Sequence, residues 1–303
     1  MITGEHAVVY GHPAIVCAID QRVTLSFEPR HDTKVCVQSD VAETTENEIA
    51  DARAEGPLRF VFGAIEQFAD QLSNGFNLTI QSEINPTLGL GSSAAVTAAM
   101  FAGLNMMVHP DQDITTGLVR ADLHDTALKL IRKIQGRGSG ADLAASFFGG
   151  MLSYQIGDAE SQASVSSLPP PPPMSLRYSG YKTPTSVVLE KVANEMKARE
   201  AEFAKLYQKM GLYSGVAIEA AKHKNWPVFH VQIDIYQRLM AQLGVSDETL
   251  DLLVEEATQQ PGVESAKISG SGLGDCIVAF GDCPATHTPV KLAEDGVRIE
   301  AIG

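Results

Sequence analysis

One stretch decides the fold: Pro86-Thr-Leu-Gly-Leu-Gly-Ser-Ser-Ala-Ala95. It follows residues 76–82, whose alternating apolar and polar side chains predict a half-buried strand, and it leads into an apolar helix. Glycines allow a backbone to approach a ligand closely, and the serines and the helix start offer N–H and hydroxyl donors to an anion. The stretch therefore predicts a phosphate-binding loop, although not one of the Walker type, because no lysine follows the glycines.

Two other interpretations account for part of this stretch. The spacing Gly89-x-Gly91-x-x-Ala94 fits a dinucleotide-binding fingerprint, with Asp111 about 20 residues further on. That fingerprint requires a strand that runs directly into the first glycine, whereas residues 85–88 intervene here. A serine N-cap on an apolar helix would explain one serine but not the whole run. The phosphate-binding loop therefore remains the preferred interpretation.

The same region is uncharged for long enough to resemble a membrane span. No charged residue occurs from Ile84 to Val108, but glycines, serines and a proline crowd the first half. Only residues 94–108 are continuously helix-forming, which is fewer than the roughly 20 residues that a bilayer requires. We therefore expect a loop followed by a buried helix, and no membrane partner.

Working outward, apolar residues at helical spacing predict helices at 58–72, 94–108, 116–134, 186–210, 213–222, 228–243 and 247–259. Strand patterns occur at 7–10, 14–19, 22–27, 34–38, 76–82, 149–154, 176–180, 265–269, 276–280 and 296–301. Residues 39–56 are expected to form a loop that can include a short helix, and 157–173 a linker that ends in the prolines 169–173. The pattern indicates a chain that contains both helices and strands, with a seam at 169–173 that divides residues 1–168 from residues 174–303.

Composition excludes several classes of function. The 303 residues are 44% hydrophobic and carry a net charge of −14, which indicates a folded chain without an extended nucleic-acid surface. A phosphate held locally by backbone N–H groups remains compatible with that charge. Because Glu5 and His6 interrupt any apolar start, no secretory signal is expected. The cysteines show neither CxxC nor zinc spacing, so reduced thiols and a cytoplasmic location are expected for Cys17, Cys36, Cys276 and Cys283.

Two further loops are rich in small residues. The first is Gln135-Gly-Arg-Gly-Ser-Gly-Ala-Asp142, and the second is Lys267-Ile-Ser-Gly-Ser-Gly-Leu-Gly-Asp-Cys276. Alone, Asp142 would be an N-cap of the apolar segment that follows it, and the second loop would be an ordinary turn between strands. Glycine and serine density at three separated places, however, indicates a shared role.

The three loops, in this order, resemble those of the GHMP family of small-molecule kinases. The first matches the family's phosphate loop, and the third matches its C-terminal glycine-rich motif. The opening, Gly4-Glu-His-Ala-Val-Val-Tyr-Gly11, is similar to that of the members that phosphorylate mevalonate. The resemblance implies a two-lobed α+β fold, in which residues 1–168 form an ATP-binding, ribosomal S5 domain 2-like lobe and residues 174–303 a ferredoxin-like lobe.

The implied activity is ATP- and Mg²⁺-dependent phosphorylation of the hydroxyl of a small hydroxy acid. Mevalonate, converted to 5-phosphomevalonate for isoprenoid biosynthesis, is the first expectation, and phosphomevalonate, another small alcohol or a sugar is the alternative. A catalytically weakened relative that binds a nucleotide without turnover is a further alternative, as is the dinucleotide-dependent enzyme considered above. The resemblance implies a cytoplasmic enzyme with a small-molecule partner, and it leaves a homodimer open.

The resemblance also assigns roles residue by residue. Asp142 matches the catalytic aspartate that orients or deprotonates the attacking hydroxyl, and Ser93 would also face Mg²⁺. The ATP phosphates would be bound by Leu88, Gly89, Leu90, Gly91, Ser92, Ser93 and Ala94. The acceptor would be bound by Glu5, His6, Ser139, Gly270, Ser271 and Gly272.

Three departures from the family pattern concern charge. Family members carry a lysine a few residues before Gly-Glu-His, close to the catalytic aspartate, whereas this chain starts at Met1. Either the natural start lies upstream or another cation substitutes, with Lys182 and Arg137 as the candidates. Ile131 stands where the Mg²⁺-binding glutamate is expected, and Asp275 replaces a glycine of the third motif. The missing lysine matters most, because few cations are then left to face a tetra-anionic nucleotide.

Overall fold

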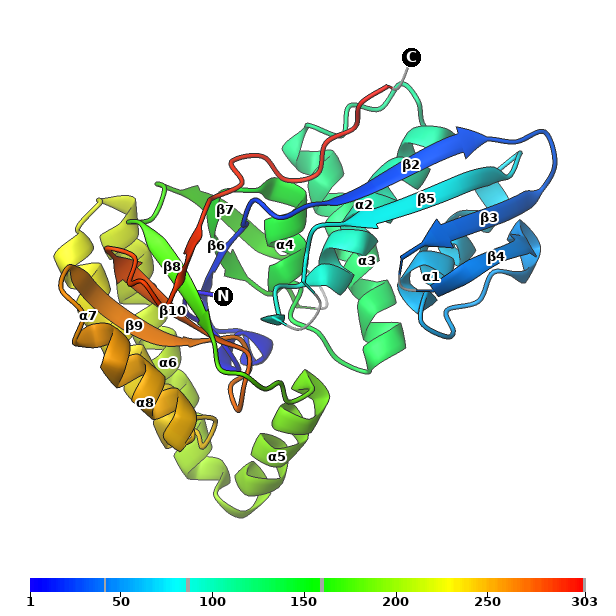
Figure 1. Cartoon of the computed structure of the whole chain (residues 1–303). Helices are drawn as coiled ribbons and strands as arrows, with labels where there is room; N and C mark the ends of the chain where they lie inside the picture. The colour runs from blue at the N-terminus through cyan, green and yellow to red at the C-terminus, as the bar shows by residue number, and fades with distance from the viewer. Residues whose placement is uncertain (41, 86–87, 159–160, 302–303) are drawn as a thin grey trace. The chain divides into compact units, whose positions relative to one another are not determined.

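The computed structural model describes residues 1–40, 42–85, 88–158 and 161–301. Helices and sheets are both present, as the sequence predicts, and the chain forms two compact units that interleave along its length (Figure 1). Unit 1 comprises Met1–Asp20, Pro86–Gly89 and Gly150–Glu294, and unit 2 comprises Gln21–Asn85, Leu90–Gly149 and Asp295–Gly303. The phosphate-loop sequence therefore passes from one unit into the other.

Unit 2 contains a four-stranded sheet with helices packed against it. The strand order is β2 (Val23–Pro29), β5 (Phe76–Ser82), β3 (Lys34–Ser39) and β4 (Ala42–Glu48). The β3–β5 pair is parallel and the other two pairs are antiparallel. The helices of this unit are α1 (Arg59–Phe68), α2 (Ser92–Val108), α3 (Gly117–Gln135) and α4 (Ala141–Phe148).

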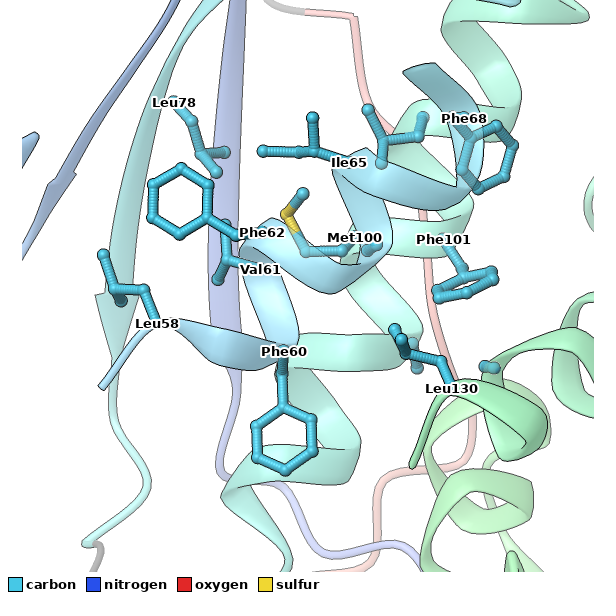
Figure 2. Packing of buried hydrophobic residues seen from close by; sticks show 14 of the residues in the cluster. Leu58, Phe60, Val61, Phe62, Ile65, Phe68, Leu78, Met100, Phe101 and Leu130 are labelled. Atoms are coloured by element: carbon cyan, nitrogen blue, oxygen red, sulfur yellow. The ribbon is translucent and has the colours of Figure 1, made fainter. Parts of the chain in front are cut away.

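The core of unit 2 lies between this sheet and the helices. Figure 2 shows side chains of α1, such as Ile65, gathered with Leu78 of β5 and with Met100 and Phe101 of α2. Met100 and Phe101 are fully buried, which explains why α2 carries no charge. The helix also approaches β2 closely, because a Cβ atom on Gly103 would lie 2.4 Å from the ring of Phe27. The uncharged stretch is thus a core helix, as expected.

Unit 1 contains two sheets. One has the order β1 (Ala14–Cys17), β6 (Met151–Gln155) and β7 (Ser164–Leu168), and the other has the order β11 (Thr288–Val290), β8 (Met174–Tyr178), β10 (Cys276–Gly281) and β9 (Val263–Ser269). All their strand pairs are antiparallel. The α-helices that the structure describes in this unit are α5 (Thr185–Ala198), α6 (Glu200–Lys222), α7 (Trp226–Gln242) and α8 (Glu248–Thr258). Helices α7 and α8 pack against β9.

Three predicted elements are wrong because tertiary contacts override local pattern. Residues 7–10 form a 3₁₀ helix, η1 (Ala7–Tyr10), rather than a strand, since the preceding turn has positive φ at Gly4 and His6. The long helix predicted over 186–210 is broken at Arg199, whose backbone is not helical, although neither glycine nor proline marks the break. No strand forms at 296–301. The sheet that contains β8, β9 and β10 instead has β11 as its edge strand.

Two segments expected to be loops contain edge strands. Within 39–56, residues 42–48 form β4, and within the linker 157–173, residues 164–168 form β7. Both strands are polar and largely exposed, because one side of an edge strand faces water and such a strand then lacks an apolar signature. Prolines 169–173 link β7 to β8, which both lie in unit 1. The compact units thus do not coincide with the two halves that the sequence analysis separated at 169–173. The division into those two halves stays a prediction.

Two further observations concern the thiols and the length of the apolar helices. Cys17, Cys36, Cys276 and Cys283 are all free thiols. Among the described residues, no helix combines the length and the apolar character that crossing a bilayer demands.

Candidate active site

Helix α2 begins at Ser92, and two glycines in the residues just before it have a left-handed backbone. Gly89 has a φ of +67°, and Gly91, the N-cap residue, has a φ of +78° and makes no side-chain cap hydrogen bond. The first intrahelical bond joins the N–H of Ala95 to the carbonyl of Gly91 at 3.1 Å. The N–H groups of residues 92–94 therefore have no partner within the helix, which makes this helix start suited to bind an anion.

Helix α4 places Asp142 beside that helix start. Asp142 lies in the first turn of α4, after the N-cap Gly140, whose φ is +83°. A Cβ atom on Gly91 would lie 3.6 Å from the Cβ atom of Asp142 and 3.9 Å from its Oδ2 atom. The Asp142 side chain is exposed. Unit 2 thus brings an accessible carboxylate and an uncapped helix N-terminus within a few ångströms of each other.

The loop before α4 is held by residues of α3. The Nε2 atom of His124 lies 2.9 Å from the carbonyl oxygen of Gly140, and Nε of Arg132 donates to the carbonyl of Gly138 at 3.1 Å. Because a carbonyl only accepts, the His124 Nε2 atom carries the proton. Burial lowers the pKa of His124, so the ring is neutral at neutral pH. Ser139 accepts from the N–H of Ala141 at 3.3 Å, which is a turn contact and leaves its acceptor-binding role a prediction.

His124 is a functional candidate that the sequence analysis missed. It lies 16 residues before Gly140, and nothing in that spacing signals a contact. Ile131, at the position of the expected Mg²⁺ ligand, is a core residue 8% exposed. Arg137 is exposed in the loop before α4.

In unit 1, Glu5 and His6 sit at the end of a turn that glycine makes possible. Gly4 has a φ of +98°, and a Cβ atom there would lie 2.2 Å from the Cβ atom of Ala14. Glu5 is 2% exposed and its Oε1 atom lies 2.5 Å from Nζ of Lys267, which is fully buried on β9. The backbone carbonyl of Glu5 accepts a hydrogen bond from Tyr236 Oη at 3.0 Å.

His6 points toward the third glycine-rich loop. Its Nε2 atom lies 2.7 Å from the carbonyl oxygen of Ser271, so Nε2 donates and Nδ1 is left as an acceptor in the neutral ring. Burial lowers the pKa of His6, and the hydrogen bond to Ser271 and the charge of Glu5 oppose that effect. The backbone of His6 has a φ of +60°, which a residue with a side chain rarely adopts, and such strain clusters at ligand sites.

The third loop depends on glycine for both conformation and space. Gly272 has a φ of +84°, and a Cβ atom there would lie 2.3 Å from the carbonyl oxygen of Val245. Gly270 also has a positive φ, of +100°. The N–H of Leu273 donates to the carbonyl of Val245 at 2.8 Å, which joins the loop to the segment that follows α7. The loop is therefore a rigid backbone surface around Ser271.

Asp275 ends this loop against the first half of the phosphate-loop sequence. It is 5% exposed, has a φ of +62°, and its carboxylate would lie within 2.8 Å of a Cβ atom on Gly89. The thiol of Cys276 contacts the carbonyl of Leu88 at 3.6 Å in the same place. Burial raises the pKa of Asp275, and the charge of the exposed Lys182 opposes that rise. A carboxylate thus occupies the position where the family pattern has glycine.

Unpartnered buried atoms gather in this part of unit 1. Nine buried side-chain nitrogen or oxygen atoms of the described residues have no hydrogen-bond partner, and four of them belong to Thr3, Glu5, Ser271 and Asp275. Leaving such an atom unsatisfied costs about 1–3 kcal/mol, which a ligand with hydroxyl groups can offset. Segments 3–6 and 267–275, which contact each other through Glu5 and His6, therefore have the character of a polar ligand site.

The expected site residues thus form two groups. Unit 2 holds Leu90, Gly91, Ser92, Ser93, Ala94, Ser139 and Asp142. Unit 1 holds Glu5, His6, Leu88, Gly89, Gly270, Ser271 and Gly272. Lys267 joins the second group, although the sequence analysis assigned it no role.

Comparison with known families matches two segments of the chain, one in each half. Residues 59–150 match the family described as GHMP kinases N terminal domain, and residues 217–298 match GHMP kinases C terminal. Mevalonate kinase of Archaeoglobus fulgidus is 30% identical over 304 residues, which cover 99% of this chain and 96% of that protein. Mevalonate kinase of Pyrococcus furiosus is 28% identical, with all of this chain and 96% of that protein covered.

Solved structures share the fold. The Lin0012 protein from Listeria innocua matches with a TM-score of 0.85 and 21% identity, over 96% of this chain and 95% of that one. Mevalonate kinase of Methanococcus jannaschii matches with a TM-score of 0.73 and 21% identity, over 93% and 87% of the two chains.

Proposed function

This chain belongs to the GHMP kinase family, and we propose that it transfers the γ-phosphoryl group of ATP to a hydroxyl of mevalonate, giving 5-phosphomevalonate. The observation that carries the reaction type is the approach of Asp142 to the uncapped start of α2 at Gly91. The acceptor follows from the relatives of about this length that are mevalonate kinases.

Unit 2 has the groups that a magnesium nucleotide requires. The first-turn N–H groups of α2 carry the partial positive charge of the helix start and would bind the phosphates. Such local binding suits a chain of net charge −14, because the nucleotide is not attracted over long range by the protein's net charge. The hydroxyl of Ser93 and the carboxylate of Asp142 are oxygen donors, which Mg²⁺ prefers, and they belong to two neighbouring helix starts. When bound, Mg²⁺ neutralises phosphate charge during transfer.

Asp142 orients the acceptor hydroxyl and takes its proton. In the transfer, the hydroxyl oxygen forms a bond to the γ-phosphorus while the bond from that phosphorus to the β,γ-bridging oxygen breaks, and ADP leaves. The exposed Asp142 side chain is reachable by an acceptor, and the His124 and Arg132 bonds hold the loop that positions it. Positioning and charge stabilisation supply most of the catalysis of phosphoryl transfer.

We assign acceptor binding to Glu5 and His6 of unit 1. Mevalonate offers hydroxyl groups as donors, and both the unpartnered Oε2 atom of Glu5 and the Nδ1 atom of the neutral His6 ring are acceptors. Backbone N–H groups of the loop at Gly270 and Gly272, together with the Ser271 hydroxyl, are donors suited to a carboxylate. The donor and acceptor set therefore fits a small hydroxy acid.

The test is a coupled assay of ADP release by the purified chain with Mg·ATP. The acceptors are mevalonate, phosphomevalonate, galactose and homoserine, each with a no-acceptor control. We expect ADP release with mevalonate, in equal amount to the 5-phosphomevalonate formed. If the enzyme instead phosphorylates another acceptor, that acceptor takes the place of mevalonate as the proposed substrate. ADP release that does not depend on any acceptor would overturn the proposal.

A further inference from the structure

Lys267 is a fully buried lysine whose ammonium group meets the Gly-Glu-His turn. Its side chain is 0% exposed, and Nζ donates to Oε1 of Glu5 at 2.5 Å and to the carbonyl of Ile268. The ammonium group also lies 5.5 Å from the ring centroid of Tyr236, a favourable cation–π position. The contact joins residues 262 positions apart in the chain.

A buried ion pair contributes little net free energy to the stability of a fold. Removing both charges from water costs more than their attraction commonly returns, so apolar side chains of similar volume serve packing as well or better. Burial lowers the pKa of Lys267, and the adjacent Glu5 carboxylate opposes that effect by favouring the ammonium form. The pair is thus retained against a desolvation cost, which calls for a role that apolar residues cannot fill.

Backbone contacts already attach the N-terminal segment to its surroundings. The N–H of Ile2 and that of Thr3 donate to the carbonyl of Ile15, and Ser269 Oγ donates to the carbonyl of Met1. Tyr236 also donates to the backbone carbonyl of Glu5. The charge pair therefore adds little to attachment, but among the described residues Lys267 is the one that binds the carboxylate of Glu5 and fixes its direction.

The Glu5 carboxylate is engaged through one oxygen only. Oε1 accepts from Lys267, whereas Oε2 is buried and has no partner among the described residues. In the next residue, His6 donates through Nε2 and keeps Nδ1 as an acceptor. Glu5 Oε2 and His6 Nδ1 are thus two acceptor atoms, on adjacent residues, that are held in place and can accept hydrogen bonds from a ligand.

We propose that Lys267 is a positioning residue for the acceptor: its ammonium group binds Oε1 of Glu5 and so holds Oε2, with the adjoining His6, in the orientation that accepts a substrate hydroxyl. The inference rests on the proposed function for the identity of the acceptor. It assigns Lys267 an effect on acceptor binding and none on nucleotide binding.

The kinetic test compares Lys267→Met, Lys267→Arg and the wild type, with ATP and R-mevalonate varied separately. Lys267→Met should raise the KM for mevalonate at least 10-fold while the KM for ATP changes less than 2-fold. Lys267→Arg keeps the charge and should recover part of the loss. Lys209→Met, which removes an exposed lysine of α6, is the matched control and should leave both constants unchanged.

A second measurement needs no acceptor and no turnover. The imidazole of His6, assigned by its absence in His6→Gln, is titrated by NMR in the wild type and in Lys267→Met. If Lys267 holds the turn, its loss exposes the ring, and the His6 pKa should move up from its lowered position toward the ordinary value of about 6.5. This readout stands even if a different acceptor replaces mevalonate.

Two outcomes would overturn the proposal. One is a folded Lys267→Met with wild-type KM for the acceptor that the wild type phosphorylates and an unchanged His6 titration. The other is an equal rise of both KM values, which would mean a general loss of structure. Failure of the wild type to phosphorylate any acceptor would instead count against the proposed function, and the His6 titration would still decide on Lys267.

Discussion

Two regions of the molecule hold a glycine-rich loop by the same kind of contact but place their carboxylates in opposite environments. In unit 2, His124 donates to the carbonyl of Gly140, two residues before Asp142, and in unit 1 His6 donates to the carbonyl of Ser271. In both places a buried neutral histidine fastens a glycine loop. The carboxylates differ, because Asp142 is exposed at a helix start whereas Glu5 is 2% exposed and paired with Lys267.

The difference teaches which property each carboxylate controls. An exposed carboxylate in the first turn of a helix is solvated by water and lies at the positive end of the helix dipole, so it can act on a reactant without a protein partner. A buried carboxylate requires a counter-charge, so its removal leaves the partner unpaired in the interior. The Asp142 region should therefore control turnover, and the Glu5 region should control stability and acceptor binding together.

The largest expected effect concerns Asp142. Asp142→Asn keeps the shape of the side chain but cannot accept the hydroxyl proton, so kcat should fall by about 10³-fold. The melting temperature should stay close to that of the wild type, because the side chain is exposed. Asp70→Asn, an exposed aspartate of the same unit, serves as the control. A rate loss below tenfold would contradict the catalytic role proposed for Asp142.

The opposite pattern is expected for Glu5. Glu5→Gln leaves the Lys267 ammonium buried without a counter-charge, and it should lower the free energy of unfolding in urea by about 3 kcal/mol. Glu46→Gln, which breaks surface pairs with Arg30 and Lys34, should change the unfolding free energy little. Equal stability of the two variants would mean that the buried pair is not needed for the fold.

The buried histidines give both regions a shared sensitivity to acid. Burial lowers the pKa of His6 and of His124 below the value of about 6.5 that an unfolded chain has. As the pH falls through 6.5 the unfolded state therefore takes up protons first, so stability drops by up to about 1.4 kcal/mol per pH unit and histidine. Above that pH neither state is protonated, and the contribution disappears.

The measurement is the melting temperature from pH 8 to pH 5.5. His124→Gln should reduce the acid slope, whereas His31→Gln, which changes an exposed histidine of the same unit, should leave it unchanged. Identical slopes for these two variants would show that the loop contact does not depend on a neutral ring.

The smallest effect is expected at Asp275, where the two regions share the phosphate-loop sequence. Asp275→Asn removes a charge beside Gly89 while it keeps the left-handed backbone, and nucleotide binding should tighten a few-fold, since one like charge contributes about 1 kcal/mol. Asp275→Gly should tighten nucleotide binding similarly, and it should also remove the strain of a left-handed backbone at a residue with a side chain. Isothermal titration with a non-hydrolysable ATP analogue and Mg²⁺ measures both. Weaker binding in both variants would mean that the carboxylate assists the nucleotide instead.

Local patterns predicted much of the fold. The helices predicted at 58–72 and 94–108 correspond to α1 (Arg59–Phe68) and α2 (Ser92–Val108), since both helices bury apolar residues that the sequence pattern reveals. Edge strands such as β4 and β7 were missed because their exposed polar residues match loop composition. The break at Arg199 was missed because no glycine or proline marks it.

Only the structure placed Asp142 in the first turn of α4, whose N-cap is Gly140 rather than Asp142 itself. The sequence by itself determined the three glycine-rich loops and the helix that follows the first of them. These features depend on backbone conformations and N–H groups within a few residues, so spacing alone reveals them. Only the tertiary structure decided that Lys267 meets Glu5 and that His124 meets Gly140. Such contacts join segments brought together by the burial of apolar surface, and no local pattern records which polar groups that burial makes neighbours.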